Sequence, residues 1–201
     1  MKVRRHAWRK LWLKLLSCNL LGRAIWIDES GFRTWMQRTH ARSKCGRQVK
    51  SFQKSKSSHY TLVMAMSVSE VRAKWVFPKG LTYKRWDKFI TKYLIDVLNE
   101  GEFIMLDNLN IHKQNSSRQI LENKGVCVID QPPYSPQCNP IEEAFSKIKI
   151  IVRGQNTTSA KTLRTAIDLA ISKITRRNIE GWVRHAFRHI ATWQQDFLAN
   201  N

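Results

Sequence analysis

The segment Ala24-Ile25-Trp26-Ile27-Asp28 sets the fold of this chain. Its four apolar residues, β-branched and aromatic among them, predict a short buried strand that ends in a carboxylate. A second apolar run, Phe103–Leu106, predicts a strand that leads into Asp107 in the same way. Glu142 opens a helix that is predicted to begin near Pro140, after a proline-rich turn. Strand ends and helix starts are the places where open α/β sheets carry functional groups.

Periodic patterns place further elements around these segments. Runs typical of strands cover residues 61–67, 74–77 and 126–129. Apolar side chains at helical spacing cover residues 86–98, 163–174 and 179–197, and a polar helix is predicted around 115–123. Strands come first, strands and helices then alternate, and helices finish the chain. That order predicts an α/β fold with a mixed sheet flanked by helices.

Positive charge dominates the composition. The chain has 201 residues, with 35 Lys and Arg against 15 Asp and Glu, so its formal net charge is +20. An excess of that size destabilises a compact chain by self-repulsion and is usually kept for a polyanionic partner. Nucleic acid is therefore the expected partner, with an anionic membrane surface as the second possibility. Within residues 37–60 every charged side chain is basic, and this segment predicts a loop or an irregular hairpin.

Several classes of protein are not indicated by the sequence. No apolar run approaches the roughly 18–20 residues that a membrane span needs. The four cysteines form no C-x-x-C pair, so neither a zinc knuckle nor a disulfide framework is indicated, and a reducing, intracellular setting is expected.

Residues 1–27 contain no Asp or Glu and predict a basic amphipathic helix packed on the domain or the stub of a longer chain. A mitochondrial transit peptide is the alternative, and a secretory signal is not favoured because Lys14 interrupts the apolar region.

The acids Asp28, Asp107 and Glu142 point to metal chemistry when they are taken together. Three carboxylates at one place repel one another unless a cation lies between them. Mg²⁺ prefers such oxygen ligands, and two ions about 4 Å apart can activate a nucleophile and stabilise the leaving oxygen of a phosphodiester. Taken singly, each aspartate could cap a turn, and Asn139 with Glu142 resembles a capping box. The combination on a basic chain predicts metal-dependent chemistry on a nucleic-acid backbone.

Helical geometry separates Glu142 from its neighbour Glu143. The apolar face of this predicted helix is formed by Ile141, Phe145, Ile148 and Val152. At about 100° per residue, Glu142 lies on the flank of that face and Glu143 lies nearly opposite it. A metal ligand has to reach back over the sheet, so Glu142 is the preferred candidate. On the last predicted helix, His185 and His189 are interpreted as a polar flank, with a metal site as the alternative.

Four motifs together resemble one protein family. They are Ile27-Asp28-Glu29-Ser30-Gly31-Phe32, Leu106-Asp107-Asn108 with His112, Pro132-Pro133-Tyr134-Ser135-Pro136, and Asn139-Pro140-Ile141-Glu142-Glu143 with Lys147 and Lys149. This set resembles the catalytic domain of Tc1/mariner-type transposases, including their bacterial IS630 relatives. The 34 residues between Asp107 and Glu142 are a spacing typical of that family. The resemblance covers roughly residues 22–155.

The resemblance implies an RNase H-like fold with a mixed five-stranded sheet flanked by helices and extra C-terminal helices. Residues 1–21 are then a basic helix or linker stub, 22–155 the DDE catalytic domain, and 156–201 helices that pack on it. It also implies a cut-and-paste mechanism, in which Asp28, Asp107 and Glu142 hold two Mg²⁺ or Mn²⁺ ions. Water first cleaves the transposon end, and the freed 3′-hydroxyl then attacks target DNA.

The resemblance also assigns partners and supporting residues. Asn108 and His112 are expected either to support the metal ligands or to face DNA. DNA at the transposon ends and at the target is the expected partner of the following basic residues: Arg38, Arg42, Lys44, Arg47, Lys50, Lys54, Lys56, Lys147, Lys149 and Arg153. A solvated loop is the alternative for residues 37–60. A homodimer is implied by the family, as is a location in the nucleus of a eukaryote or the cytoplasm of a bacterium.

The chain departs from the family pattern in two ways. Gln137-Cys138 replaces the Asp-Leu that often separates Ser-Pro from Asn-Pro. Family members normally carry paired helix-turn-helix modules ahead of the catalytic domain, and the residues before Ala24 do not supply them. Without these modules, the expected means of recognising the transposon ends is missing. This departure predicts a truncated or split product. The alternative to an active enzyme is a catalytically silent, truncated or domesticated DNA-binding relic of a transposase.

Overall fold

The computed structural model describes residues 2–36, 44–45, 57–133 and 135–198. Its centre is a five-stranded sheet in the order β3-β2-β1-β4-β5. The strands are β1 (Ala24–Arg33), β2 (His59–Met66), β3 (Val71–Pro78), β4 (Phe103–Leu106) and β5 (Cys127–Asp130). β1 pairs antiparallel with β2 and parallel with β4, so the sheet is mixed, as the sequence predicted.

The first strand is longer than the sequence predicted. Asp28 does not end β1; it lies in the middle of a strand that continues to Arg33. The polar continuation is held in the sheet because β2 pairs with it along its whole length, from Trp26 opposite Met66 to Arg33 opposite His59. The same pairing brings the last residues of the predicted loop 37–60 into β2.

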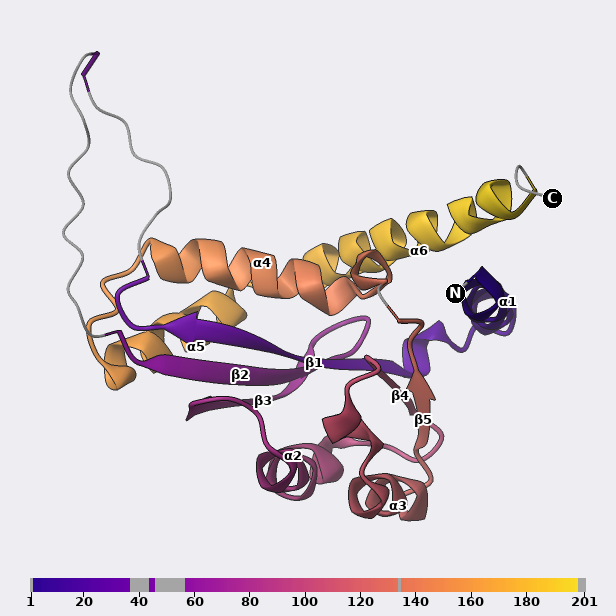
Figure 1. The fold of residues 1–201 in the computed structure, drawn as a ribbon, viewed down its shortest axis with the longest axis horizontal. Coiled ribbons are helices and arrows are strands. Elements are labelled where there is room, and N and C mark those ends of the chain that lie inside the picture. The colour runs from indigo at the N-terminus through magenta and orange to yellow at the C-terminus, as the bar shows by residue number, and fades with distance from the viewer. Residues whose placement is uncertain (1, 37–43, 46–56, 134, 199–201) are drawn as a thin grey trace.

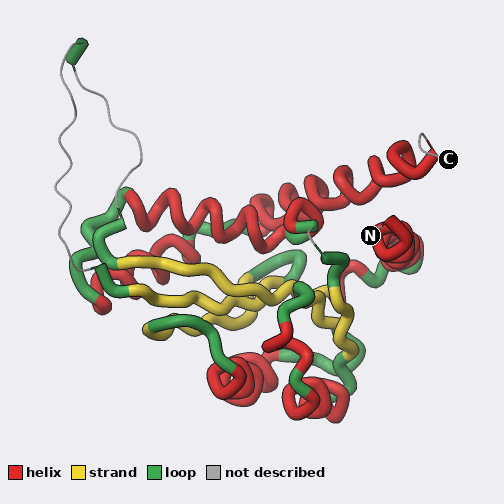
Figure 2. Tube along the Cα trace, viewed as in Figure 1, coloured by secondary structure: helices red, strands yellow, loops and turns green. Residues whose placement is uncertain are grey.

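Helices cover both faces of the sheet, as Figures 1 and 2 show. On one side lie α1 (Lys2–Ser17), α4 (Pro140–Arg153), α5 (Ala160–Ser172) and α6 (Arg176–Leu198), and on the other lie α2 (Tyr83–Phe89) and α3 (Asn115–Asn123). Alternation along β1 divides the apolar residues between two cores. Trp26 belongs to the core under α4, whereas Ile25 and Ile27 belong to the core over α2 and α3.

The N-terminal helix α1 packs on the domain, which is one of the alternatives that the sequence left open. Trp8 and Trp12 are buried, and the ring of Trp12 lies 6.1 Å from that of Trp26. Burying two indole side chains stabilises the docked helix by several kcal/mol, on the order of 2–3 kcal/mol for each large apolar side chain. None of the helices in the described part of the chain is long and apolar enough to cross a membrane.

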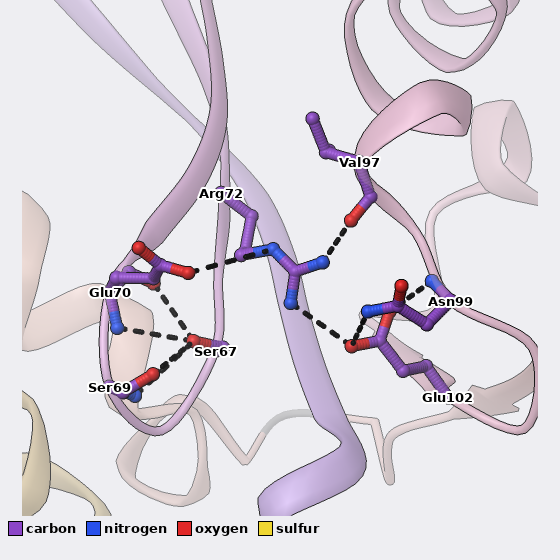
Figure 3. Close-up of polar contacts among 7 residues, drawn as sticks. All are labelled: Ser67, Ser69, Glu70, Arg72, Val97, Asn99 and Glu102. Atoms are coloured by element: carbon purple, nitrogen blue, oxygen red, sulfur yellow. Dashed lines mark hydrogen bonds and ion pairs between the residues drawn. The ribbon is translucent and has the colours of Figure 1, made fainter.

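The helix predicted over residues 86–98 changes its winding. The α-helix ends at Phe89, a π-helical turn covers Ile90–Leu94, and a 3₁₀ turn covers Ile95–Val97. Arg72 of β3 stabilises this end, because its guanidinium donates to the carbonyl of Val97 and to Glu102 Oε1 at 3.0 Å. Figure 3 shows Arg72 between these two partners. The network lies before β4 and is therefore at the opposite end of that strand from Asp107.

Candidate active site

Parallel pairing of β1 and β4 brings the two aspartates together. The register joins Ala24 to Phe103 and Trp26 to Met105, so Asp107, which directly follows β4, comes level with the middle of β1 where Asp28 lies. Asp28 is 7% exposed. By strand alternation its side chain shares the face of Trp26, which α4 covers.

The start of α4 lies over Asp28. Asn139, the residue before the helix, is buried, and its Nδ2 donates to Asp28 Oδ2 at 3.0 Å. The capping box that the sequence offered for Asn139 and Glu142 is wrong, because the Asn139 side chain makes no capping hydrogen bond and is engaged with Asp28 instead. Pro140 is well suited to the first helical position, where a backbone N–H would have no partner within the helix.

The three acids line one open cavity of about 570 Å³. Its other walls come from the loop after β4 and the proline-rich turn: Asn108, Leu109, Gln131, Pro132, Pro133, Ser135, Pro136 and Asn139. Two buried polar atoms of the lining, Gln131 Nε2 and Asn139 Oδ1, have no hydrogen-bond partner among the described residues. The structure therefore brings Asp28, Asp107, Glu142 and Asn108 to one place that still has unused hydrogen-bonding capacity.

Negative charge accumulates in this cavity. Burial, together with the nearby carboxylates of Glu29, Glu142 and Asp107, raises the pKa of Asp28 to about 8, although the backbone N–H of Glu29 opposes the shift. Desolvation also raises the pKa of Glu142, and Asp107 and Glu29 add to it against the opposing effect of Lys149. Such carboxyl groups release their protons readily only when positive charge is placed among them.

His112 supports Asp107 from inside the fold. The side chain is fully buried, and its Nδ1 lies 2.7 Å from Asp107 Oδ1 while its Nε2 lies 3.6 Å from Glu29 Oε2. Burial lowers the pKa of His112, but the nearby carboxylates of Asp107 and Glu29 outweigh that effect and raise the pKa to about 9. Its ring packs on Trp86, with centroids 4.3 Å apart. Because His112 has no exposed surface, contact with DNA is not open to it.

Two supporting residues were quoted in the sequence motifs without being selected. Glu29 directly follows Asp28 and Asn139 lies three residues before Glu142, so both stand in the segments that carry the acids. Their position beside the candidate acids in these motifs was the available signal. Their partners come from other elements, so that the contacts with His112 and Asp28 needed the tertiary structure.

The predicted DNA-binding residues separate into four groups. Lys149 lies near Glu142, with its Nζ 6.0 Å from the centre of the Phe32 ring, and Arg153 follows one turn later on the same flank of α4. Lys147 is directed elsewhere, because its Nζ donates to Lys173 O at 2.8 Å and to Asn178 Oδ1 at 2.5 Å. Lys44 is exposed. The rest of the set lies outside the described residues: Arg38, Arg42, Arg47, Lys50, Lys54 and Lys56.

The donor set of the cavity fits a hard divalent cation. Carboxylate oxygens and the amide oxygen of Asn139 are the ligands that Mg²⁺ and Mn²⁺ take. In the described residues no three His, Cys, Asp or Glu side chains already stand close enough to enclose one ion. Asp28 and Asp107 instead contact Asn139 and His112. The chemistry of the donors therefore matches these metals, and the amide oxygen of Asn139 is a buried acceptor that no other described residue contacts by a hydrogen bond.

Comparisons with known proteins agree with this geometry. The sequence model of the family described as DDE superfamily endonuclease matches residues 23–164. Among curated proteins, the transposable element Tc3 transposase of Caenorhabditis elegans is 31% identical over 97 residues, which cover 47% of this chain and 30% of that protein. The matched region therefore covers less than a third of the length of that relative.

Solved structures share the fold. The catalytic domain of Mos1 mariner transposase has a TM-score of 0.75 at 15% identity, covering 97% of this chain and 92% of that one. The Mos1 strand transfer complex has a TM-score of 0.77 at 15% identity, covering 96% of this chain and 60% of that one. The mariner Mos1 paired end complex with Mg has a TM-score of 0.76 at 16% identity, covering 96% and 62%. These likenesses confirm the predicted RNase H-like fold.

Proposed function

Because this chain belongs to the DDE superfamily endonucleases, we propose that Asp28, Asp107 and Glu142 are its catalytic acids and that it cuts and joins DNA as a Tc1/mariner-type transposase does. One observation carries this proposal. Three acids from β1, the end of β4 and the start of α4 line a single cavity although they are far apart in the sequence. The similarity to Tc3 transposase supports the Tc1/mariner assignment.

Two Mg²⁺ or Mn²⁺ ions are the proposed cofactors, held by Asp28, Asp107 and Glu142. When bound, such ions activate the attacking oxygen and stabilise the leaving oxygen of a phosphodiester. The raised pKa values of Asp28 and Glu142 support this assignment, because buried carboxyl groups with other carboxylates nearby ionise more easily when a cation lies among them. The similar Mos1 paired end complex was solved with Mg, which is in keeping with the donor set here.

The protein's own residues hold the acids in place. Asn139 donates to Asp28, and His112 holds Asp107 while it also approaches Glu29. With its pKa near 9, the imidazole of His112 carries a positive charge at neutral pH and offsets part of the negative charge of the two acids. We therefore assign His112 and Asn139 as positioning residues and Asn108, which lines the cavity, as a residue that faces the substrate.

DNA is the proposed substrate. Lys149 and Arg153 continue from Glu142 along one flank of α4 and provide a basic path that leads away from the cavity. The basic stretch 37–60 is proposed to contact DNA as well, on the strength of its charge. Lys147 is not part of this proposed path because it is engaged at the junction of α5 and α6. A homodimer, acting in a nucleus or a bacterial cytoplasm, is proposed from the family resemblance.

Nicking of supercoiled DNA tests the proposed chemistry. The full chain is expected to nick or linearise plasmid when Mg²⁺ or Mn²⁺ is supplied, and Asp107→Ala is expected to abolish this activity while DNA binding persists. A chain that binds DNA but is inactive with either metal would support the alternative of a catalytically silent relic. Activity that survives Asp107→Ala would show that the acids are assigned wrongly. A donor with inverted repeats then distinguishes strand transfer from plain cleavage.

A further inference from the structure

A second polar cluster lies beside the acidic cavity, between α4 and α6. His185 and His189 are one helical turn apart on α6, and their Nε2 atoms approach to 3.1 Å. Glu143 of α4 contacts the other nitrogen of His185, with Oε1 at 2.6 Å from Nδ1. The side chains of His185 and Glu143 are 47% and 37% exposed, so that ions in solution can reach them. His185 also lines an open cavity of about 350 Å³ next to Glu142 and Asn139.

The hydrogen bonds of this cluster leave the Nε2 atoms of His185 and His189 facing each other. An ionised carboxylate can only accept a hydrogen bond, so His185 donates from Nδ1 to Glu143. Its Nε2 then faces His189 Nε2, and this contact requires one hydrogen between two nitrogens. A transition-metal ion can take the place of that hydrogen when the proton of His189 moves from Nε2 to Nδ1, because the neutral imidazole nitrogen is the commonest metal ligand in proteins.

The separation of the two nitrogens suits a single ion. Metal–nitrogen bonds at such sites are about 2.0–2.1 Å long. For two nitrogens 3.1 Å apart, bonds of that length give a nitrogen–metal–nitrogen angle of about 98°, which lies between octahedral and tetrahedral values. Glu143 occupies the position of the carboxylates that fix the tautomer and ring orientation of metal-bound histidines.

We propose that His185 and His189 bind a transition-metal ion such as Cu²⁺, Ni²⁺ or Zn²⁺, with Glu143 as the residue that positions His185. Nitrogen donors favour these ions over Mg²⁺, which takes oxygen, so this site is chemically distinct from the acidic cavity. The described residues contain no group of three His, Cys, Asp or Glu able to hold an ion. The proposed site therefore has two protein ligands, with water on the remaining positions, and modest affinity is expected.

Cu²⁺ binding to the full chain, followed by electron paramagnetic resonance in excess Mg²⁺, tests this proposal. The expected spectrum shows hyperfine coupling to two imidazole nitrogens, both in the wild type and in Asp107→Asn, which weakens the carboxylate cavity. Glu143→Gln is expected to weaken Cu²⁺ binding by about tenfold while the two-nitrogen pattern remains. His189→Gln is expected to weaken binding further and to leave coupling to one nitrogen.

His59→Gln is the matched control, because His59 is an exposed histidine on β2, away from α6. It is expected to bind Cu²⁺ as the wild type does, and circular dichroism checks that each variant is folded. Equal Cu²⁺ affinity in His189→Gln and the wild type, or a spectrum without coupling to two nitrogens, would overturn the proposed site. Unchanged affinity in Glu143→Gln would overturn the role of Glu143.

Discussion

His112 lies directly behind Asp107, with its Nδ1 2.7 Å from the carboxylate Oδ1 and no surface of its own exposed. Its second nitrogen approaches Glu29, which follows Asp28 along β1 and by strand alternation points to the opposite face. The imidazole thereby joins the loop after β4 to β1. It also places a positive charge behind a cavity in which acids accumulate.

Replacing His112 is expected to damage both stability and activity. His112→Ala leaves Asp107 and Glu29 without their buried partner, and because both carboxylates are partly exposed the expected cost is about 1–3 kcal/mol. Urea unfolding measures this change, with His59→Ala as a control at an exposed histidine. His112→Asn can still donate to Asp107 and is expected to retain more nicking activity than His112→Ala. Equal stability of His112→Ala and the wild type would contradict the role of this contact.

The stability of the metal-free protein is expected to fall as the pH rises. The pKa of Asp28 is raised from 3.8 to about 8, so between these values the folded chain holds a proton that the unfolded chain has lost. The pKa of His112 is raised from 6.5 to about 9, so its stabilisation is complete below 6.5 and is lost as the pH rises through 9. The two effects have the same sign and overlap between pH 6.5 and 8.

Asp28→Asn separates the two contributions. It removes the titration of Asp28 and is expected to flatten the decline between about pH 4 and 6.5, while the decline due to His112 remains. Urea unfolding in the presence of a chelator, repeated across this range, measures the two profiles. If the wild type and Asp28→Asn show parallel profiles, the raised pKa of Asp28 is incorrect.

Divalent metal is expected to stabilise the folded chain. An ion that binds only the folded state at ten times its Kd adds about 1.4 kcal/mol to the free energy of unfolding. Thermal unfolding with increasing Mn²⁺ is expected to show this rise in the wild type and to lose most of it in Asp107→Asn. A rise of the same size in both proteins would place the ion elsewhere than among the three acids.

Two lysines of α4 offer a matched pair for DNA binding. Lys149 lies near Glu142, and its replacement by Ala is expected to reduce the log–log salt slope of DNA binding by about 0.9, the value for one phosphate contact. Lys147→Ala is expected to leave the slope unchanged and to lower stability, because Lys147 bonds Lys173 O and Asn178. Binding measured by fluorescence anisotropy at several salt concentrations tests both. Equal slopes in Lys149→Ala and the wild type would remove Lys149 from the proposed path.

Strong local patterns made much of the fold predictable. β4 and α3 have the predicted bounds because each is a short segment with clear boundaries in the sequence, and α4 begins at the predicted Pro140. The full length of β1 was missed because Glu29 to Arg33 has little strand character of its own and is held by pairing with β2. The winding of Ile90–Leu94 was missed because apolar spacing does not distinguish an α-helix from a π-helical turn.

Local chemistry in the chain was enough to predict a mixed sheet flanked by helices, to name Asp28, Asp107 and Glu142 as the candidate acids, and to predict a polyanionic partner. It could not show that Asn139 turns to Asp28, that His112 is buried against Asp107, or that Lys147 points away from the cavity. Those contacts join residues from different elements. Their energies depend on burial and on distances that arise only when β1, β4 and α4 come together.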